Sequence, residues 1–163
     1  ELALPQHLAI AEKQLADAYL ELRLLPEALA LFDEAWHRFE QLALPDEEAW
    51  VLVQRGRVLA LLDNAAAAAE ALQRAADLFE RQGNAVGAAA VALARAELAL
   101  ARGDATSALA FANRSSAAYG AAGQKAQAHE AVHLLARVYW YTVEFGLLHT
   151  HAGLRAYGAG ILS

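Results

Sequence analysis

The sequence predicts an all-α protein, a right-handed α-solenoid of about seven or eight helices arranged in antiparallel pairs. The first observation is a 40-residue period of small residues, at Ala16, Gly56, Ala96 and Ala136 and again at Ala28, Ala68 and Ala108. The second is an aromatic residue in the same frame, at Phe39, Phe79 and Tyr119. The third is composition, since 58% hydrophobic residues with only three prolines in 163 favour packed helices over strands. A period of this length is typical of solenoids, in which each unit buries its apolar face against its neighbours.

Apolar residues at helical spacing predict each helix, and turn residues separate them. Residues 1–7 are expected to be a short lead-in, and Pro26 stands where a helix tolerates proline, in its first turn. The predicted helices run from Leu8 to about Arg23, from Pro26 to the break at Leu44-Pro45, from there to about Leu62, and then over 65–81, 85–101, 105–119 and 124 to about 144. The units are 8–44, 45–84, 85–123 and a degenerate fourth, 124–163.

The last twenty residues or so depart from this pattern. Glycines interrupt the expected partner helix of the fourth unit, and Leu148 and Arg155 fall where two alanines belong. We expect a frayed capping helix, because the preceding helix needs its face covered. A segment that docks into a groove or a neighbouring molecule, and a stretch foreign to the fold, are the alternatives. Since the chain begins with Glu1 and contains no methionine, we expect it to be part of a larger protein.

Three units place small or apolar residues at the same positions in register, although the individual matches are degenerate and only the first unit has aromatic residues at two of them. They are Ala16, Tyr19, Arg23, Ala28, Phe32 and Ala35; then Gly56, Leu59, Asp63, Ala68, Leu72 and Ala75; then Ala96, Ala99, Gly103, Ala108, Ala112 and Ser115. This pattern resembles the tetratricopeptide repeat (TPR) over about residues 8–144. The 40-residue period is longer than the usual TPR repeat, so each helix should be about a turn longer. In this it is similar to long arrays in bacterial multidomain signalling regulators and protease-linked proteins. Arg55 and Arg95 depart from the family, which usually has leucine there.

The resemblance implies a concave groove formed by the first helix of each pair. Asp17, Arg57, Glu97 and Arg137 would alternate in charge across that groove. They form either a structural charge ladder between helices, or a site where Arg57 and Arg137 bind carboxylate or phosphate groups. The other candidate partner-binding residues are Lys13, Glu21, Trp50, Gln54, His133, Trp140 and Tyr141. The two aromatics beside Arg137 are typical of a peptide hot spot, or else pack under the tail.

Residues 129–133 match the H-E-x-x-H pattern, in which two histidines bind zinc and the glutamate activates water. The spacing suits a helix, but no third protein ligand is evident. A zinc metallopeptidase is therefore a remote alternative, and adventitious metal binding is another. The interpretation that we adopt is that these are ordinary surface residues. Stoichiometric zinc that survives dialysis and is lost in His133→Ala would reverse this interpretation.

Charge and composition exclude several classes of function. The net charge of −6 argues against nucleic acid, which needs a clustered basic face. No cysteine is present, which excludes disulfides and thiolate metal sites. No apolar run is long enough to span a membrane. We expect a cytoplasmic, non-catalytic interaction module without metal or cofactor, within a larger signalling or regulatory protein. It would bind a protein or peptide, with or without acidic groups. The main alternative is homo-oligomerisation through the terminal helices and the apolar tail.

Overall fold

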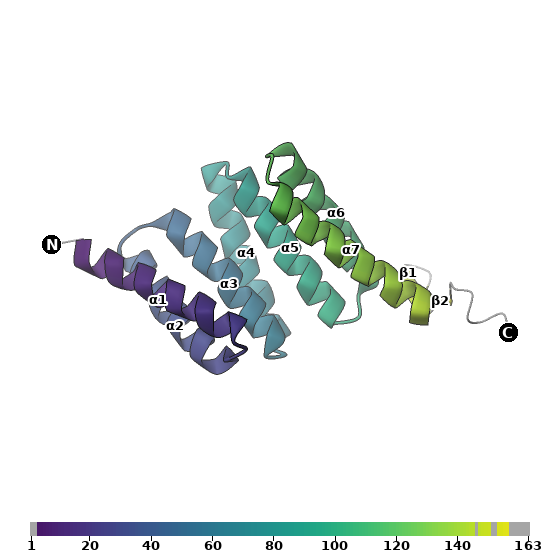
Figure 1. Cartoon of the computed structure of the whole chain (residues 1–163), viewed down its shortest axis with the longest axis horizontal. Helices are drawn as coiled ribbons and strands as arrows, with labels where there is room; N and C mark the ends of the chain where they lie inside the picture. The colour runs from purple at the N-terminus through teal and green to yellow at the C-terminus, as the bar shows by residue number, and fades with distance from the viewer. Residues whose placement is uncertain (1–2, 146, 151–152, 157–163) are drawn as a thin grey trace. The chain divides into compact units, whose positions relative to one another are not determined.

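The computed structural model describes residues 3–145, 147–150 and 153–156, which form helices followed by one β-hairpin (Figure 1). The helices are α1 (Ala3–Glu21), α2 (Leu25–Gln41), α3 (Pro45–Leu61), α4 (Ala65–Gln82), α5 (Ala85–Ala101), α6 (Ala105–Ala121) and α7 (Lys125–Phe145). The strands are β1 (Leu147–Thr150) and β2 (Gly153–Ala156). The chain forms two compact units, Glu1–Gly87 and Ala88–Ser163. The predicted all-α helical repeat is confirmed, with seven helices in the described residues.

The first helix is longer than predicted. It begins at Ala3 instead of Leu8, so most of the expected lead-in is helical. Pro5 did not prevent this, because proline in the first helical turn removes no intrahelical hydrogen bond.

All six connections between helices use the same turn. One residue in each adopts the left-handed conformation, namely Arg23, Ala43, Asp63, Gly83, Gly103 and Gly123, at a spacing of 20 residues. At the first turn the Arg23 amide donates to the Leu20 carbonyl at 3.1 Å, and the Leu24 amide donates to the Tyr19 carbonyl at 2.9 Å. This pair of bonds is the Schellman arrangement, which satisfies the last carbonyls of a helix. The repeat therefore consists of two 20-residue halves with the same ending.

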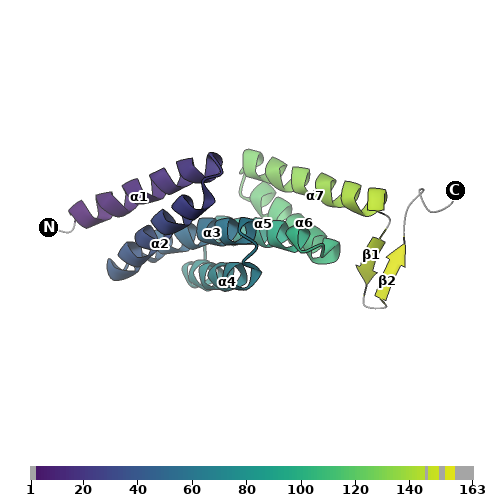
Figure 2. The same ribbon diagram turned by 90° about the horizontal axis from the view of Figure 1, so that it is seen from below.

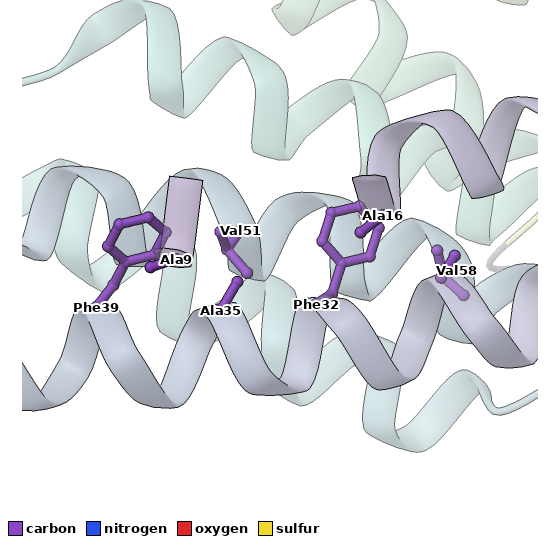
Figure 3. Packing of buried hydrophobic residues seen from close by; sticks show 8 residues of the cluster. Ala9, Ala16, Phe32, Ala35, Phe39, Val51 and Val58 are labelled. Atoms are coloured by element: carbon purple, nitrogen blue, oxygen red, sulfur yellow. The ribbon is translucent and has the colours of Figure 1, made fainter. Parts of the chain in front are cut away.

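The first unit has a core in which two helices close over the aromatic face of α2 (Figure 3). The ring of Phe39 lies beside Ala9, and the ring of Phe32 lies beside Ala16. Val51 and Val58 of α3 complete the same cluster, all of it fully buried. The small residues are required where helices approach, because a Cβ on Gly56 would lie 2.8 Å from the Leu72 side chain.

The second unit packs α6 against α7 with a smaller core. Ala99, Ala105, Ala108 and Val138 form its cluster. Ser115 occupies a position where the other units have alanine and is fully buried. Its hydroxyl donates to the Ala89 carbonyl at 2.9 Å, which satisfies the buried oxygen.

The prediction of a capping helix after α7 is wrong for the described residues. In its place β1 and β2 form an antiparallel hairpin, with Leu147 opposite Ala156 and His149 opposite Leu154 (Figure 2). Leu148 and Arg155 stand where the other second helices have alanine, so a helix there could not approach α7 closely. Gly153 adds a poor helix former. In its described residues, the fourth unit is therefore one helix followed by a hairpin.

Candidate functional site

The predicted partner-binding residues fall into two groups, one in each compact unit. The first unit holds Lys13, Asp17, Glu21, Trp50, Gln54 and Arg57, and the second holds Glu97, His133, Arg137, Trp140 and Tyr141.

The first group contains a continuous polar line across α1 and α3. Lys13 Nζ lies 2.9 Å from Asp17 Oδ2, one helical turn away on α1. Gln54 donates from Nε2 to Asp17 Oδ1 at 3.1 Å, and accepts from Arg57 Nη1 at 3.4 Å. Asp17 is thus held on both carboxylate oxygens, and Gln54 links it to Arg57. In this unit Asp17 and Arg57, two members of the predicted charge ladder, are thus connected through Gln54.

The remaining residues of the first group differ in their surroundings. Glu21 is exposed at the end of α1. Trp50 is half-buried, and its ring packs edge-to-face on Phe79 of α4 with centroids 5.0 Å apart. Much of the Trp50 side chain therefore stabilises the α3–α4 pair.

The second group places three exposed side chains on α7. His133, Arg137 and Trp140 are exposed, Trp140 to 65% of its surface. Trp140 is therefore mostly exposed, and the alternative for this residue, packing under the tail, concerns residues that lie partly outside the described ones. Glu97 on α5 is half-buried and has an interaction partner. The side chain of Tyr141 lies outside the described residues. A cation and an indole exposed one turn apart are a combination common in interface hot spots.

The two histidines of the H-E-x-x-H segment face each other on α7. Their Nε2 atoms lie 2.9 Å apart and both rings are exposed. In the described part of the chain, no cluster of three or more His, Cys, Asp or Glu side chains could hold a metal ion. A closed three-ligand zinc site is therefore not found among these residues.

A second polar cluster of the first unit, on α2, α3 and α4, was not predicted. Two guanidinium groups lie over the ring of Trp36, with Arg55 Cζ at 5.2 Å and Arg74 Cζ at 5.0 Å from its centroid. Arg55 pairs with Asp33. This pairing explains an arginine at a position where the repeat family has leucine. The only sequence signal was that departure itself, since Trp36 and Arg74 lie far from Arg55 along the chain.

Ion pairs in this cluster and beside it shift three pKa values. Arg74 binds both Glu40 and Glu48, with Nη2 at 2.7 Å from Glu48 Oε1. The hydrogen bond from Arg74 lowers the pKa of Glu40 below 4.5 and raises that of Arg74. A bifurcated hydrogen bond from Arg38 Nε to the two carboxylate oxygens of Glu12, at 3.0 and 2.8 Å, raises the pKa of Arg38. Each cluster ties neighbouring helices together.

Solved structures show what fold this is. The structure of BtubC (BKLC) from P. vanneervenii superposes with a TM-score of 0.61 at 17% identity, covering 85% of this chain and 65% of that one. A Podosopora anserina protein with nearly identical TPR-like repeats, described as a kinesin light chain, superposes with a TM-score of 0.53 at 16% identity, covering 82% and 76%. The fold is TPR-like. The resemblance inferred from the repeat period is therefore confirmed at the level of fold.

The C-terminal third of the sequence is similar to part of a different family. Residues 107–163 match the model of the biopterin-dependent aromatic amino acid hydroxylases. Phenylalanine-4-hydroxylase of Chromobacterium violaceum is 67% identical over 46 residues, which are 28% of this chain and 16% of that enzyme. Tyrosine 3-monooxygenase of Drosophila melanogaster is 56% identical over 34 residues, 21% of this chain and 6% of that enzyme. The chain thus spans under a fifth of the length of these relatives.

No helix in the described part of the chain is both long enough and apolar enough to cross a membrane.

Proposed function

We propose that this chain is a non-catalytic protein-interaction module that binds a peptide or a partner segment on the first helices of its repeats. The TPR-like fold supports an interaction role, since helical arrays present extended surfaces to partners. The observation that carries the proposal for particular residues is the exposed set His133, Arg137 and Trp140 on α7. Trp140 supplies an apolar anchor, and Arg137 selects acidic groups. The module acts within a larger cytoplasmic signalling or regulatory protein.

Capture of partners from a cell lysate by the immobilised chain tests the proposal, with Arg137→Glu/Trp140→Ala as the loss variant. Arg102→Glu is the matched control, because Arg102 is likewise an exposed arginine of the second unit but lies in the α5–α6 turn and not on α7. A captured protein is then produced pure and titrated against all three. Binding that the control retains and the double variant loses by tenfold or more is expected. Equal binding by all three would reject α7 as the working surface.

A second candidate function follows from the similarity of residues 107–163 to aromatic amino acid hydroxylases. In this alternative, α6, α7 and the hairpin are part of a hydroxylase-type domain. Its test is the conversion of phenylalanine to tyrosine with a reduced biopterin and added divalent metal ions. Because the chain spans 16% of the bacterial enzyme, we expect no tyrosine from the chain alone. Tyrosine formation would favour the catalytic alternative over the interaction module.

A further inference from the structure

Helix α1 has a second apolar stripe, on the side opposite its core contacts. Ala9 and Ala16 face the core of the first unit, whereas the second stripe is exposed along its whole length. This outer stripe consists of Leu4, Leu8, Ala11, Leu15, Ala18 and Leu22. Its four leucines are 78%, 44%, 45% and 68% exposed in chain order. The spacing alternates between four and three residues, the seam along which two helices pack side by side.

The same face of α3 is an established interface. Forty residues after Ala11 and Ala18 come Val51 and Val58, which are fully buried against Phe32 and Phe39 of α2. In α3, this helix face is therefore covered by the preceding helix, α2. Two members of the α3 stripe, Glu48 and Arg55, are charged and pair with neighbouring side chains.

The corresponding residues of α1 are Leu8 and Leu15, so the outer stripe carries no charge. A helix that covers it must therefore present a face without charges, because an unpaired charge buried there would be costly. The outer stripe of α1 is itself such a face.

We propose that the outer stripe pairs with the same stripe of a second copy of this chain, with the two α1 helices antiparallel. A two-fold axis near Lys13 brings large residues opposite small ones: Leu8 faces Ala18, and Ala11 faces Leu15. Leu4 and Leu22 close the two ends. Such alternation lets the side-chain layers interdigitate. Parallel pairing would instead stack leucine on leucine and alanine on alanine, leaving gaps at the alanines. This surface is separate from α7, and the proposal does not rest on the proposed function.

Polar side chains beside the stripe favour the same orientation. His7, Gln14 and Glu21 follow one edge of α1 at intervals of seven residues. Antiparallel pairing places the end that carries Glu21 next to the partner's His7. Parallel pairing would bring the two Glu21 carboxylates to the same end, where they repel.

The size of the contact predicts a weak, concentration-dependent dimer. Helix α1 has 19 residues and is about 28 Å long, so one helix pair buries less than the roughly 800 Å² per partner of a standard interface. Each copy also carries a net charge of −6, which opposes association. Added salt screens this repulsion and should strengthen the dimer.

Light scattering and sedimentation from micromolar to millimolar concentration test the dimer. We expect the mass to rise toward twice the monomer with concentration and with salt. Leu15→Glu should stay monomeric throughout. Leu61→Glu is the matched control. Leu61 lies on α3, outside the outer stripe of α1, and it is 49% exposed, compared with 45% for Leu15. A monomer at every concentration, or equal loss of dimer in both variants, would overturn the proposal.

Disulfide trapping tests the orientation, because the natural chain contains no cysteine. Single variants Ala11→Cys and Leu15→Cys are each oxidised alone and as a mixture. Antiparallel pairing predicts that the mixed disulfide exceeds both same-residue disulfides. A mixture in which the disulfide between two Leu15→Cys copies exceeds the mixed disulfide would show another arrangement and overturn the proposed register.

Discussion

Single residues at helix crossings set how closely the helices of a pair approach. Gly87 illustrates this at the start of α5, where a Cβ would lie 2.3 Å from the ring of Phe79, itself fully buried. The ring belongs to the packed core and has little room to move. The sequence signalled a need for small residues through the 40-residue period, but Gly87 is outside that set. Its role depends on the crossing geometry of two helices, which spacing alone does not contain.

Gly87→Ala is therefore expected to destabilise the protein by about 1–3 kcal/mol, the usual cost of overpacking. Gly120→Ala is the control, since nothing lies within 4 Å of a Cβ there and alanine is the better helix former. Urea unfolding followed by circular dichroism measures both. An unchanged midpoint for Gly87→Ala would show that Phe79 moves aside at no cost.

The left-handed turn residues provide a paired experiment at the same scale. Ala43 has φ 52° and Gly83 has φ 65° at equivalent positions, and a Cβ on Gly83 would meet nothing within 4 Å. Only backbone strain then differs, roughly 1–2 kcal/mol for an L side chain. Because glycine also gains freedom in the unfolded chain, Ala43→Gly should stabilise by up to about 1 kcal/mol and Gly83→Ala should destabilise by a similar amount. Shifts of the same sign in thermal unfolding would contradict this account.

At the scale of helices, ion pairs connect neighbouring elements, and the apolar periodicity of the sequence does not predict them. The sequence predicted the helix boundaries to within a few residues, apart from the start of α1, because turn residues and apolar spacing are local signals. It did not predict that Arg74 of α4 reaches Glu40 of α2 and Glu48 of α3. Such pairs depend on side-chain reach between helices. The hairpin was not predicted, because we expected the helical repeat to continue into the residues after α7, which no longer follow its pattern.

The lowered pKa of Glu40 predicts a contribution to acid stability. The carboxylate is favoured in the folded protein, so its contribution is present above about pH 4.5 and is lost as the pH falls through the lower folded pKa. In Glu40→Gln the melting temperature should therefore fall less steeply between neutral and acid pH than in the parent. Arg74→Gln, which removes the donor, should flatten the same acid limb. Parallel curves for parent and both variants would show that the pair contributes nothing.

Across the whole molecule, burial is concentrated in α3 and α5. Residues 51–53 and 89–94 are buried continuously along these helices, whereas α1 and α7 are exposed at most positions. Local opening is easiest where few side chains are buried. The polar line on α1 and α3 and the exposed residues of α7 thus lie partly on the less buried helices. The sequence predicted which residues these would be only through the family resemblance, since exposure depends on which helices have neighbours.

Native-state hydrogen exchange should show this gradient. We expect amides of α3 and α5 to exchange most slowly and those of α1 and α7 to exchange fastest among the helices. At high protein concentration, the proposed dimer should slow exchange selectively in α1. Uniform protection of all seven helices would mean that the chain opens only as one cooperative body.

Because the same turn recurs every 20 residues, whole units could be removed or inserted at equivalent turns. Removing residues 44–83 would join Ala43 to Asn84. The left-handed residue Ala43 would then again be followed by the residue that directly precedes a helix. The new neighbour of α2 would be α5, which offers Val91 and Leu98 where α3 offers Val51 and Val58. Gain or loss of a 40-residue unit therefore preserves both the turn chemistry and the packing register. Such an array can change length during evolution, or by design, without a new solution at the junction.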